Sequence, residues 1–259
     1  MSGYSCMRDA KYKGYKVYGK LKLPTYYAGT CPGDAPNAGV EDYKRNILPE
    51  MFFGMYDGSG LDIGVRVSYN STWRPFIYGN VFANGIDGAA FPASSVTAGT
   101  TLYMSAWVEK VGTTYYEKLN VSKTGYNNTD LMSAPLSNKI TNITFGATAL
   151  STGLLLRREN VIASNPDECE TSGCYSLGGQ WLQCGYVTAS GVTYTWRDSN
   201  SYIFTTPGAT AGASGNKVLE LRSDSGTYDP NRIKVTATTD TTSGATETVS
   251  IDFRTTPSI

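Results

Sequence analysis

The sequence predicts an all-β protein, a two-sheet antiparallel β-sandwich of the jelly-roll type, and three observations lead to this prediction. Between residues 50 and 79, apolar and polar side chains alternate with the two-residue period of β-strands. Turns rich in Gly, Asn and Ser separate strand-like segments along most of the chain. No segment shows the 3.6-residue period of a long amphipathic helix. Because so many strands do not stay in one open sheet, we expect two packed sheets.

Residues 14–23 form the first predicted strand, which Pro24 ends. Its inward-facing positions are Val17, Gly19, Leu21 and Leu23, and its outward-facing positions are Lys16, Tyr18, Lys20 and Lys22. The lysines suit the edge of a sheet, where charge prevents pairing with another chain.

Residues 50–79 read as three consecutive strands that form an antiparallel meander. Leu61, Ile63, Val65 and Val67 share one face of the middle strand, whereas Arg66 lies on the other. One face of the meander therefore belongs to the core, and the other carries polar and aromatic groups toward solvent or a ligand.

Later strands are less regular but recur to the end of the chain. Residues 100–111 form a strong strand, and Gly112 and Thr113 turn it back through residues 114–122. The further predicted strands are 140–150 with 154–163, 180–189, 192–197, 202–206, 217–222, 232–239 and 247–253. We expect one domain over residues 1–259 with a cysteine-containing loop insertion at about 164–185, and a boundary near residue 190 is the alternative.

The composition is neutral, weakly charged and rich in small and hydroxylated residues. Twenty-two basic residues balance 22 acidic ones, which argues against nucleic acid or an anionic membrane as partner. No apolar run is long enough to span a membrane. We expect a secreted or cell-surface protein, with any signal peptide removed before Met1.

Five cysteines, Cys6, Cys31, Cys169, Cys174 and Cys184, leave at least one thiol unpaired. Their clustering suggests a bridge between Cys6 and Cys31 and another among the last three, whereas the spacing fits zinc poorly. We expect no cofactor. Asp57 and Asp62 could bind structural calcium, although the Gly-rich segment between them reads more simply as a turn.

The absence of histidine removes most common catalytic arrangements. A carboxylate pair could still hydrolyse glycosides, with Glu50, Glu109 and Glu159 as candidates. A tyrosine could also act as base and acid beside an arginine in β-elimination, for which Tyr103 and Arg66 are candidates.

The strongest candidate for a binding site is one outward face of the central strands. It combines flat rings, which stack on sugars, with planar or charged hydrogen-bonding groups. Its predicted members are Arg66, Arg74, Tyr78, Tyr103, Trp107 and Glu109. An ordinary exposed sheet surface is the alternative interpretation.

The order of the strands resembles the concanavalin A-like jelly-roll superfamily of lectins and glucanases. The resemblance spans about residues 14–163 and depends on the strand 17–24, the meander 51–78 and the segment 96–107. It implies a concave sheet that grips polysaccharide. The E-x-D-x-(x)-E triplet of laminarinase-like members is missing, the nearest acidic cluster being residues 167–170. The Q-x-H strand of alginate-lyase-like members cannot exist without histidine. Glutamic peptidases of similar fold need one Gln and one Glu, which a single sequence does not identify.

These observations leave three hypotheses for the function. The first is a secreted or surface protein that binds a glycan without cleaving it. The second is a polysaccharide lyase or glycoside hydrolase without catalytic histidine. The third is a self-associating structural subunit of an extracellular filament or an adhesin.

Overall fold

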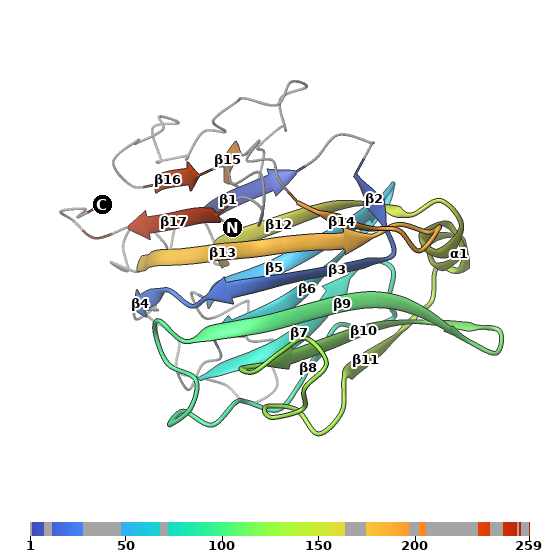
Figure 1. Cartoon of the computed structure of the whole chain (residues 1–259), viewed down its shortest axis with the longest axis horizontal. Helices are drawn as coiled ribbons and strands as arrows, with labels where there is room; N and C mark the ends of the chain where they lie inside the picture. The colour runs from blue at the N-terminus through green and yellow to red at the C-terminus, as the bar shows by residue number, and fades with distance from the viewer. Residues whose placement is uncertain are drawn as a thin grey trace.

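The structure is a computed structural model that describes residues 2–7, 12–27, 48–67, 72–163, 175–196, 202–205, 233–238, 246–252, 254 and 259. Within these residues the chain forms 17 strands and one α-helix. The predicted fold class is confirmed, because two antiparallel sheets pack face to face as a β-sandwich (Figure 1).

Sheet A contains the predicted meander. Its order is β15-β1-β12-β5-β6-β7-β8, and β2 pairs with β12 beside this path. Its strands are β1 (Ser2–Met7), β2 (Lys13–Gly14), β5 (Leu48–Asp57), β6 (Ser59–Val67), β7 (Trp73–Gly79), β8 (Ile86–Asp87), β12 (Leu154–Ala163) and β15 (Tyr202–Thr205). The antiparallel register confirms the meander, with Glu50 of β5 opposite Arg66 of β6 and Arg66 opposite Arg74 of β7.

Sheet B lies in front of sheet A in Figure 1 and has the order β11-β10-β9-β3-β13-β17-β16, with β4 and β14 pairing with β13. Its strands are β3 (Lys16–Lys22), β4 (Thr25–Tyr27), β9 (Thr101–Val111), β10 (Thr114–Ser122), β11 (Leu136–Ile140), β13 (Tyr175–Val187), β14 (Thr193–Thr195), β16 (Ile233–Thr238) and β17 (Thr246–Asp252). The predicted hairpin between residues 100 and 122 is confirmed, and Gly112 turns it with a φ of 60°.

The edge position predicted for the lysines of β3 is wrong. This strand pairs with β9 on one side and with β13 on the other, so it lies in the interior of sheet B. Val17 and Leu21 are fully buried in the core, while the lysines alternate with them on the opposite face. The lysines therefore cover a sheet surface rather than protecting an edge.

The core fills the space between the two sheets. Its fully buried members alternate along the strands of both sheets and include Val17, Leu21, Met51, Phe53, Ile63, Val65, Leu102, Met104, Ala106, Trp181 and Val249. Because these residues occupy the facing sides of both sheets, the residues between them project from two outer faces on opposite sides of the sandwich.

The strand predicted over residues 140–150 is wrong, because this segment forms the helix α1 (Ile143–Ser151). The side chain of Asn142 caps the helix by accepting a hydrogen bond from the backbone N–H of Phe145 at 3.0 Å. Phe145 and Ala149, one turn apart, bury one side of the helix. The Asn142 cap and the burial of two apolar residues one turn apart stabilise a helix here, although the β-branched residues of the segment favour a strand.

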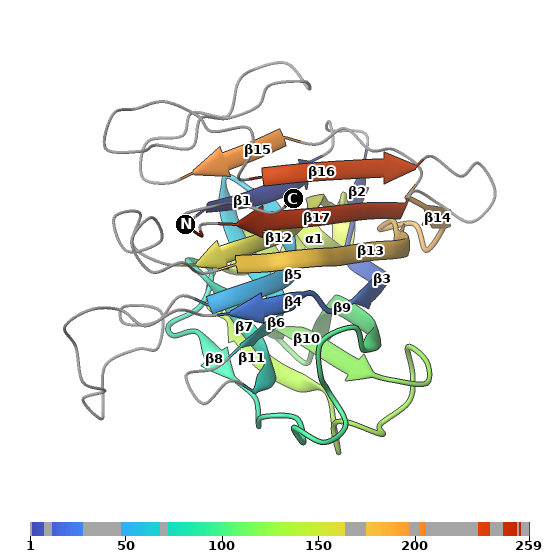
Figure 2. The same ribbon diagram turned by 90° about the vertical axis from the view of Figure 1, so that its left-hand side faces the viewer.

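The last third of the chain contributes to both sheets. Figure 2 shows β13, β17 and β16 as successive neighbours in sheet B, whereas β15 pairs with β1 in sheet A. Of the predicted loop insertion, residues 164–174 lie outside the described residues, and Tyr175–Val187 forms strand β13. The strand predicted over 217–222 also lies outside them. None of the described segments is a helix with the length and apolarity that crossing a membrane requires.

Candidate functional site

The six predicted ligand-binding residues lie on two faces rather than one. Arg66, Arg74 and Tyr78 project from β6 and β7 on the outer face of sheet A. Tyr103, Trp107 and Glu109 project from β9 on the outer face of sheet B, because Leu102, Met104, Ala106 and Val108 between and beside them enter the core. The sandwich separates the two trios.

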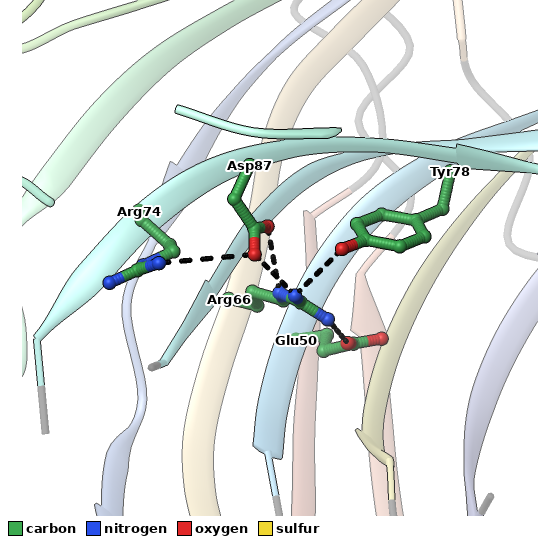
Figure 3. Close-up of polar contacts among 5 residues, drawn as sticks. All are labelled: Glu50, Arg66, Arg74, Tyr78 and Asp87. Atoms are coloured by element: carbon green, nitrogen blue, oxygen red, sulfur yellow. Dashed lines mark hydrogen bonds and ion pairs between the residues drawn. The ribbon is translucent and has the colours of Figure 1, made fainter. Parts of the chain in front are cut away.

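Arg66 is the centre of a polar cluster on the outer face of sheet A (Figure 3). Its Nε and Nη2 donate to the two carboxylate oxygens of Asp87 at 3.0 and 2.5 Å, and Nη2 also donates to Tyr78 Oη at 3.1 Å. Its Nη1 lies 3.9 Å from Glu50 Oε1, and Arg74 Nη1 lies 3.9 Å from Asp87 Oδ2. The bidentate contact attaches the two-residue strand β8 to β6 across β7.

A second arginine, Arg157 of β12, organises the neighbouring part of this face. Its Nη2 donates to Asp62 Oδ1 at 3.0 Å, and its Nε contacts the carboxylate of Glu159. Tyr56 Oη also donates to Asp62 Oδ1 at 3.0 Å, and the guanidinium lies over the Tyr56 ring. These contacts satisfy Asp62 within the protein.

Two carboxyl groups of this face have pKa values above their ordinary range. Burial raises the pKa of Glu50 to about 8, against the opposing effect of Arg66 and with a contribution from the negative charges of Asp62 and Asp87. Burial also raises the pKa of Asp62. We expect the pKa of Asp62 to rise less than that of Glu50, because the side chain of Asp62 is 29% exposed and contacts Arg157. Carboxyl groups that titrate near neutrality are suited to acid–base catalysis, although charged networks that only stabilise a fold produce the same shifts.

The outer face of sheet B has a different character, with aromatic rings beside lysines. Trp107 and Tyr103 lie four residues apart on the same side of β9, which is a separation of about 13 Å along a strand. The ammonium of Lys16 lies 5.6 Å from the centre of the Trp107 ring, and that of Lys20 lies 5.5 Å from the centre of the Tyr103 ring. Both rings are partly exposed.

A loop after β10 places a further tyrosine on this face. The Tyr126 ring packs edge-on against Tyr18 and Tyr103, with ring centres 5.2 Å apart in both pairs. Asn120 and Ser105 hold the loop by donating to the backbone carbonyl of Tyr126 at 2.9 and 3.4 Å. The sandwich therefore presents a tyrosine cluster at one end of β9 and Trp107 nearer the other.

The structure separates the residues predicted for catalysis. Tyr103 and Arg66 lie on opposite outer faces, so they cannot act together in a β-elimination. Glu109 is 45% exposed on sheet B, with Lys118 Nζ 4.0 Å away, whereas Glu50 and Glu159 are buried on the outer face of sheet A. Of the three candidate glutamates, only Glu50 and Glu159 share a face, which also carries Asp62 and Asp87.

The predicted disulfides find no support among the described residues. Cys184 is a free thiol, so a bridge among the last three cysteines that includes Cys184 is wrong. It is buried in the core, and burial raises the pKa of this thiol to about 11, which makes it a poor nucleophile. Cys31, Cys169 and Cys174 lie outside the described residues, as does the side chain of Cys6 in β1.

The calcium site considered for Asp57 and Asp62 is not assembled. Asp57 lies opposite Ser59 across a turn in which Gly58 has a φ of 68°, and Asp62 contacts Tyr56 and Arg157. Across the ranges that the structure describes, no three acidic, cysteine or histidine residues lie close enough together to hold a metal ion.

Sequence reasoning missed four contributors to these faces. Asp87 belongs to a two-residue strand, too short to give a pattern. Tyr126 comes from an irregular loop. Lys16 and Lys20 were visible as outward positions of β3, but no sequence pattern placed that strand beside β9.

Comparison with known proteins adds little to this picture. No protein-family model matches the chain, and no curated protein matches it. A crystal structure of a scytalido-glutamic peptidase with a peptide-based transition-state analogue is similar over 96% of this chain and 97% of its own, with 12% identity and a TM-score of 0.44. A likeness this distant carries no argument about function.

Proposed function

We propose that this protein binds a glycan without cleaving it, through the outer face of sheet B. The observation that carries the proposal is the pair of partly exposed rings, Trp107 and Tyr103, on one side of β9. Aromatic faces stack on the C–H groups of sugar rings, and a flat sheet can present several such faces to an extended chain. Two stacking positions about 13 Å apart suit a polymer better than a single sugar.

Charged groups beside the rings support the same proposal. Lys16, Lys20 and Glu109 can exchange hydrogen bonds with hydroxyl groups of a bound chain, because each projects from the sheet next to a ring. We extend the proposal to a location outside the cell and to the polysaccharide binding that the concanavalin A-like resemblance implies. The weakly charged, hydroxyl-rich composition supports that location.

Retention on immobilised polysaccharides tests the proposal. The intact protein is expected to be retarded on at least one polymer without releasing products from it. Trp107→Ala is expected to weaken retention about tenfold or more, because losing the apolar surface that a large ring buries costs about 1.5–3 kcal/mol. Tyr194→Ala is the matched control, since Tyr194 is 48% exposed on β14 rather than on β9. Equal weakening by both variants, or no retention on any polymer, would refute the proposal.

Acid–base cleavage of a polysaccharide on the outer face of sheet A is the second candidate function. The observation that favours it is the buried position of Glu50, which raises the pKa of its carboxyl to about 8 and would let it donate a proton, while nearby Asp87 stays in contact with Arg66. Appearance of reducing ends from a polysaccharide, abolished by Glu50→Gln, would support this function. Retention without products would exclude it for that polymer and leave the binding proposal in place.

A further inference from the structure

The part of the outer face of sheet B that β3, β9, β10 and β11 form carries far more positive than negative charge, although the chain as a whole is neutral. On the four adjacent strands β3, β9, β10 and β11, the cross-strand register and the alternation with core residues place one acidic and five basic side chains outward. They are Glu109 and the lysines Lys16, Lys20, Lys22, Lys118 and Lys139. In the adjoining loop, Lys123 and Asp130 balance each other.

Among the residues that the structure describes, most of these lysines have no carboxylate partner. Lys118 lies 4.0 Å from Glu109, and none of the other four lysines has a carboxylate of the described residues within ion-pair distance. On sheet A, by contrast, Arg66 and Arg157 are both paired with carboxylates. The outer face of sheet A is therefore charge-compensated, whereas these strands of sheet B present a cationic surface, which attracts anions locally.

The positive charges lie beside the stacking rings rather than at random. The register places Trp107 between Lys16 on β3 and Lys118 on β10, and it places Tyr103 opposite Lys20. Each ring can therefore stack on a ligand whose charged substituent meets an ammonium group next to that ring. A neutral ligand would leave these ammonium groups without an anionic partner.

We infer that the glycan bound by this face is anionic, a polymer whose sugars carry carboxylate or sulfate groups. This inference rests on the proposed function and adds the chemical class of its ligand. A glycan suits the site better than a nucleic acid because the chain as a whole carries no net positive charge, with 22 basic and 22 acidic residues, whereas nucleic-acid-binding domains are usually strongly basic.

Binding to matched pairs of polymers tests the inference. Polygalacturonate is compared with its fully methyl-esterified form, and dextran sulfate with dextran, by calorimetry at 50 mM and 500 mM NaCl. The expected result is about tenfold tighter binding to the anionic member of at least one pair at 50 mM salt, and loss of most of this preference at 500 mM. Which pair shows the preference distinguishes carboxylate from sulfate.

Charge-removing variants assign the effect to the face. Lys16→Gln combined with Lys20→Gln is expected to abolish the preference for the anionic polymer while leaving binding to the neutral one. Lys13→Gln, on β2 of sheet A, is the matched control and is expected to keep the preference. Unchanged thermal unfolding of all three proteins shows that they are folded.

The possible negative results of these experiments have different consequences. Equal affinity for neutral and anionic polymers would overturn the inference and leave the proposed function standing. Absence of binding to every polymer would overturn the proposed function itself. Equally tight binding of dextran sulfate, polygalacturonate and a single-stranded DNA oligonucleotide would overturn the inference in favour of a general polyanion surface.

Discussion

Replacing Glu50 by glutamine should stabilise the protein increasingly as the pH rises from about 4.5 to about 8. Glu50 is 6% exposed on the outer face of sheet A, and its nearest cation, Arg66, is already engaged by both oxygens of Asp87. Ionised Glu50 is therefore poorly compensated. Glutamine keeps the shape and hydrogen-bonding capacity of the protonated acid but cannot ionise.

The pKa of Glu50 sets the size of the effect. The pKa of this carboxyl is about 8 in the folded protein and about 4.5 in an unfolded chain, so the folded state binds the proton more tightly. Stability from this group is fully present below pH 4.5 and is lost as the pH rises to 8. The difference corresponds to about 1.4 kcal/mol of unfolding free energy per pH unit and about 5 kcal/mol in total.

Urea unfolding at pH 5, 6, 7 and 8 provides the assay. The free energy of unfolding of Glu50→Gln should exceed that of the unmodified protein by an amount that grows with pH and reaches about 3–5 kcal/mol at pH 8. Glu109→Gln, at an exposed position, should show no such growth. If Glu50→Gln instead loses stability as the pH rises, then Glu50 is ionised and paired with Arg66, and the reasoning fails.

Three further changes test the packing of the sandwich. Glu117 is fully buried and its carboxyl has no hydrogen-bond partner in the described part of the chain, so Glu117→Leu should raise the unfolding free energy by about 1–3 kcal/mol, and a loss of stability in thermal unfolding would show a missed partner. Arg158 and Glu247 form a fully buried ion pair between the sheets at 2.6 Å. Arg158→Met should lower the unfolding free energy by about 3–5 kcal/mol, and adding Glu247→Leu should restore most of it; an additive double variant would contradict this coupling. Asn142→Ala removes the cap of α1 and should lower the unfolding free energy by about 1 kcal/mol in urea, whereas no change would mean that packing alone holds the helix.

The local structure of this protein could be predicted where neighbouring residues determine it. The meander of β5, β6 and β7 followed from alternation and tight turns, and so did the hairpin between β9 and β10. The helix α1 was missed because its signal is a single asparagine cap and two buried residues one turn apart. That signal is weaker than the β-branched and aromatic content of the same segment.

The candidate site was harder to predict because its geometry depends on contacts between distant segments. The alternation of side chains along a strand shows that Arg66 and Trp107 point away from the core. It does not show which sheet each strand joins. The chain passes from sheet A to sheet B between β8 and β9, and this crossover separates the two predicted trios. The lysines of β3 were misread for the same reason, since only tertiary pairing reveals that β3 lies beside β9.

Retention of the full chain on a panel of neutral and acidic polysaccharides tests the central claim most directly, with Trp107→Ala and Tyr194→Ala measured beside it. We predict that at least one polymer retains the intact protein without being cleaved, and that only the Trp107 variant loses this retention. Passage of the intact protein through every polymer without delay would contradict the claim that the outer face of sheet B binds a glycan. That result would favour a structural subunit, which self-association at high protein concentration would then test.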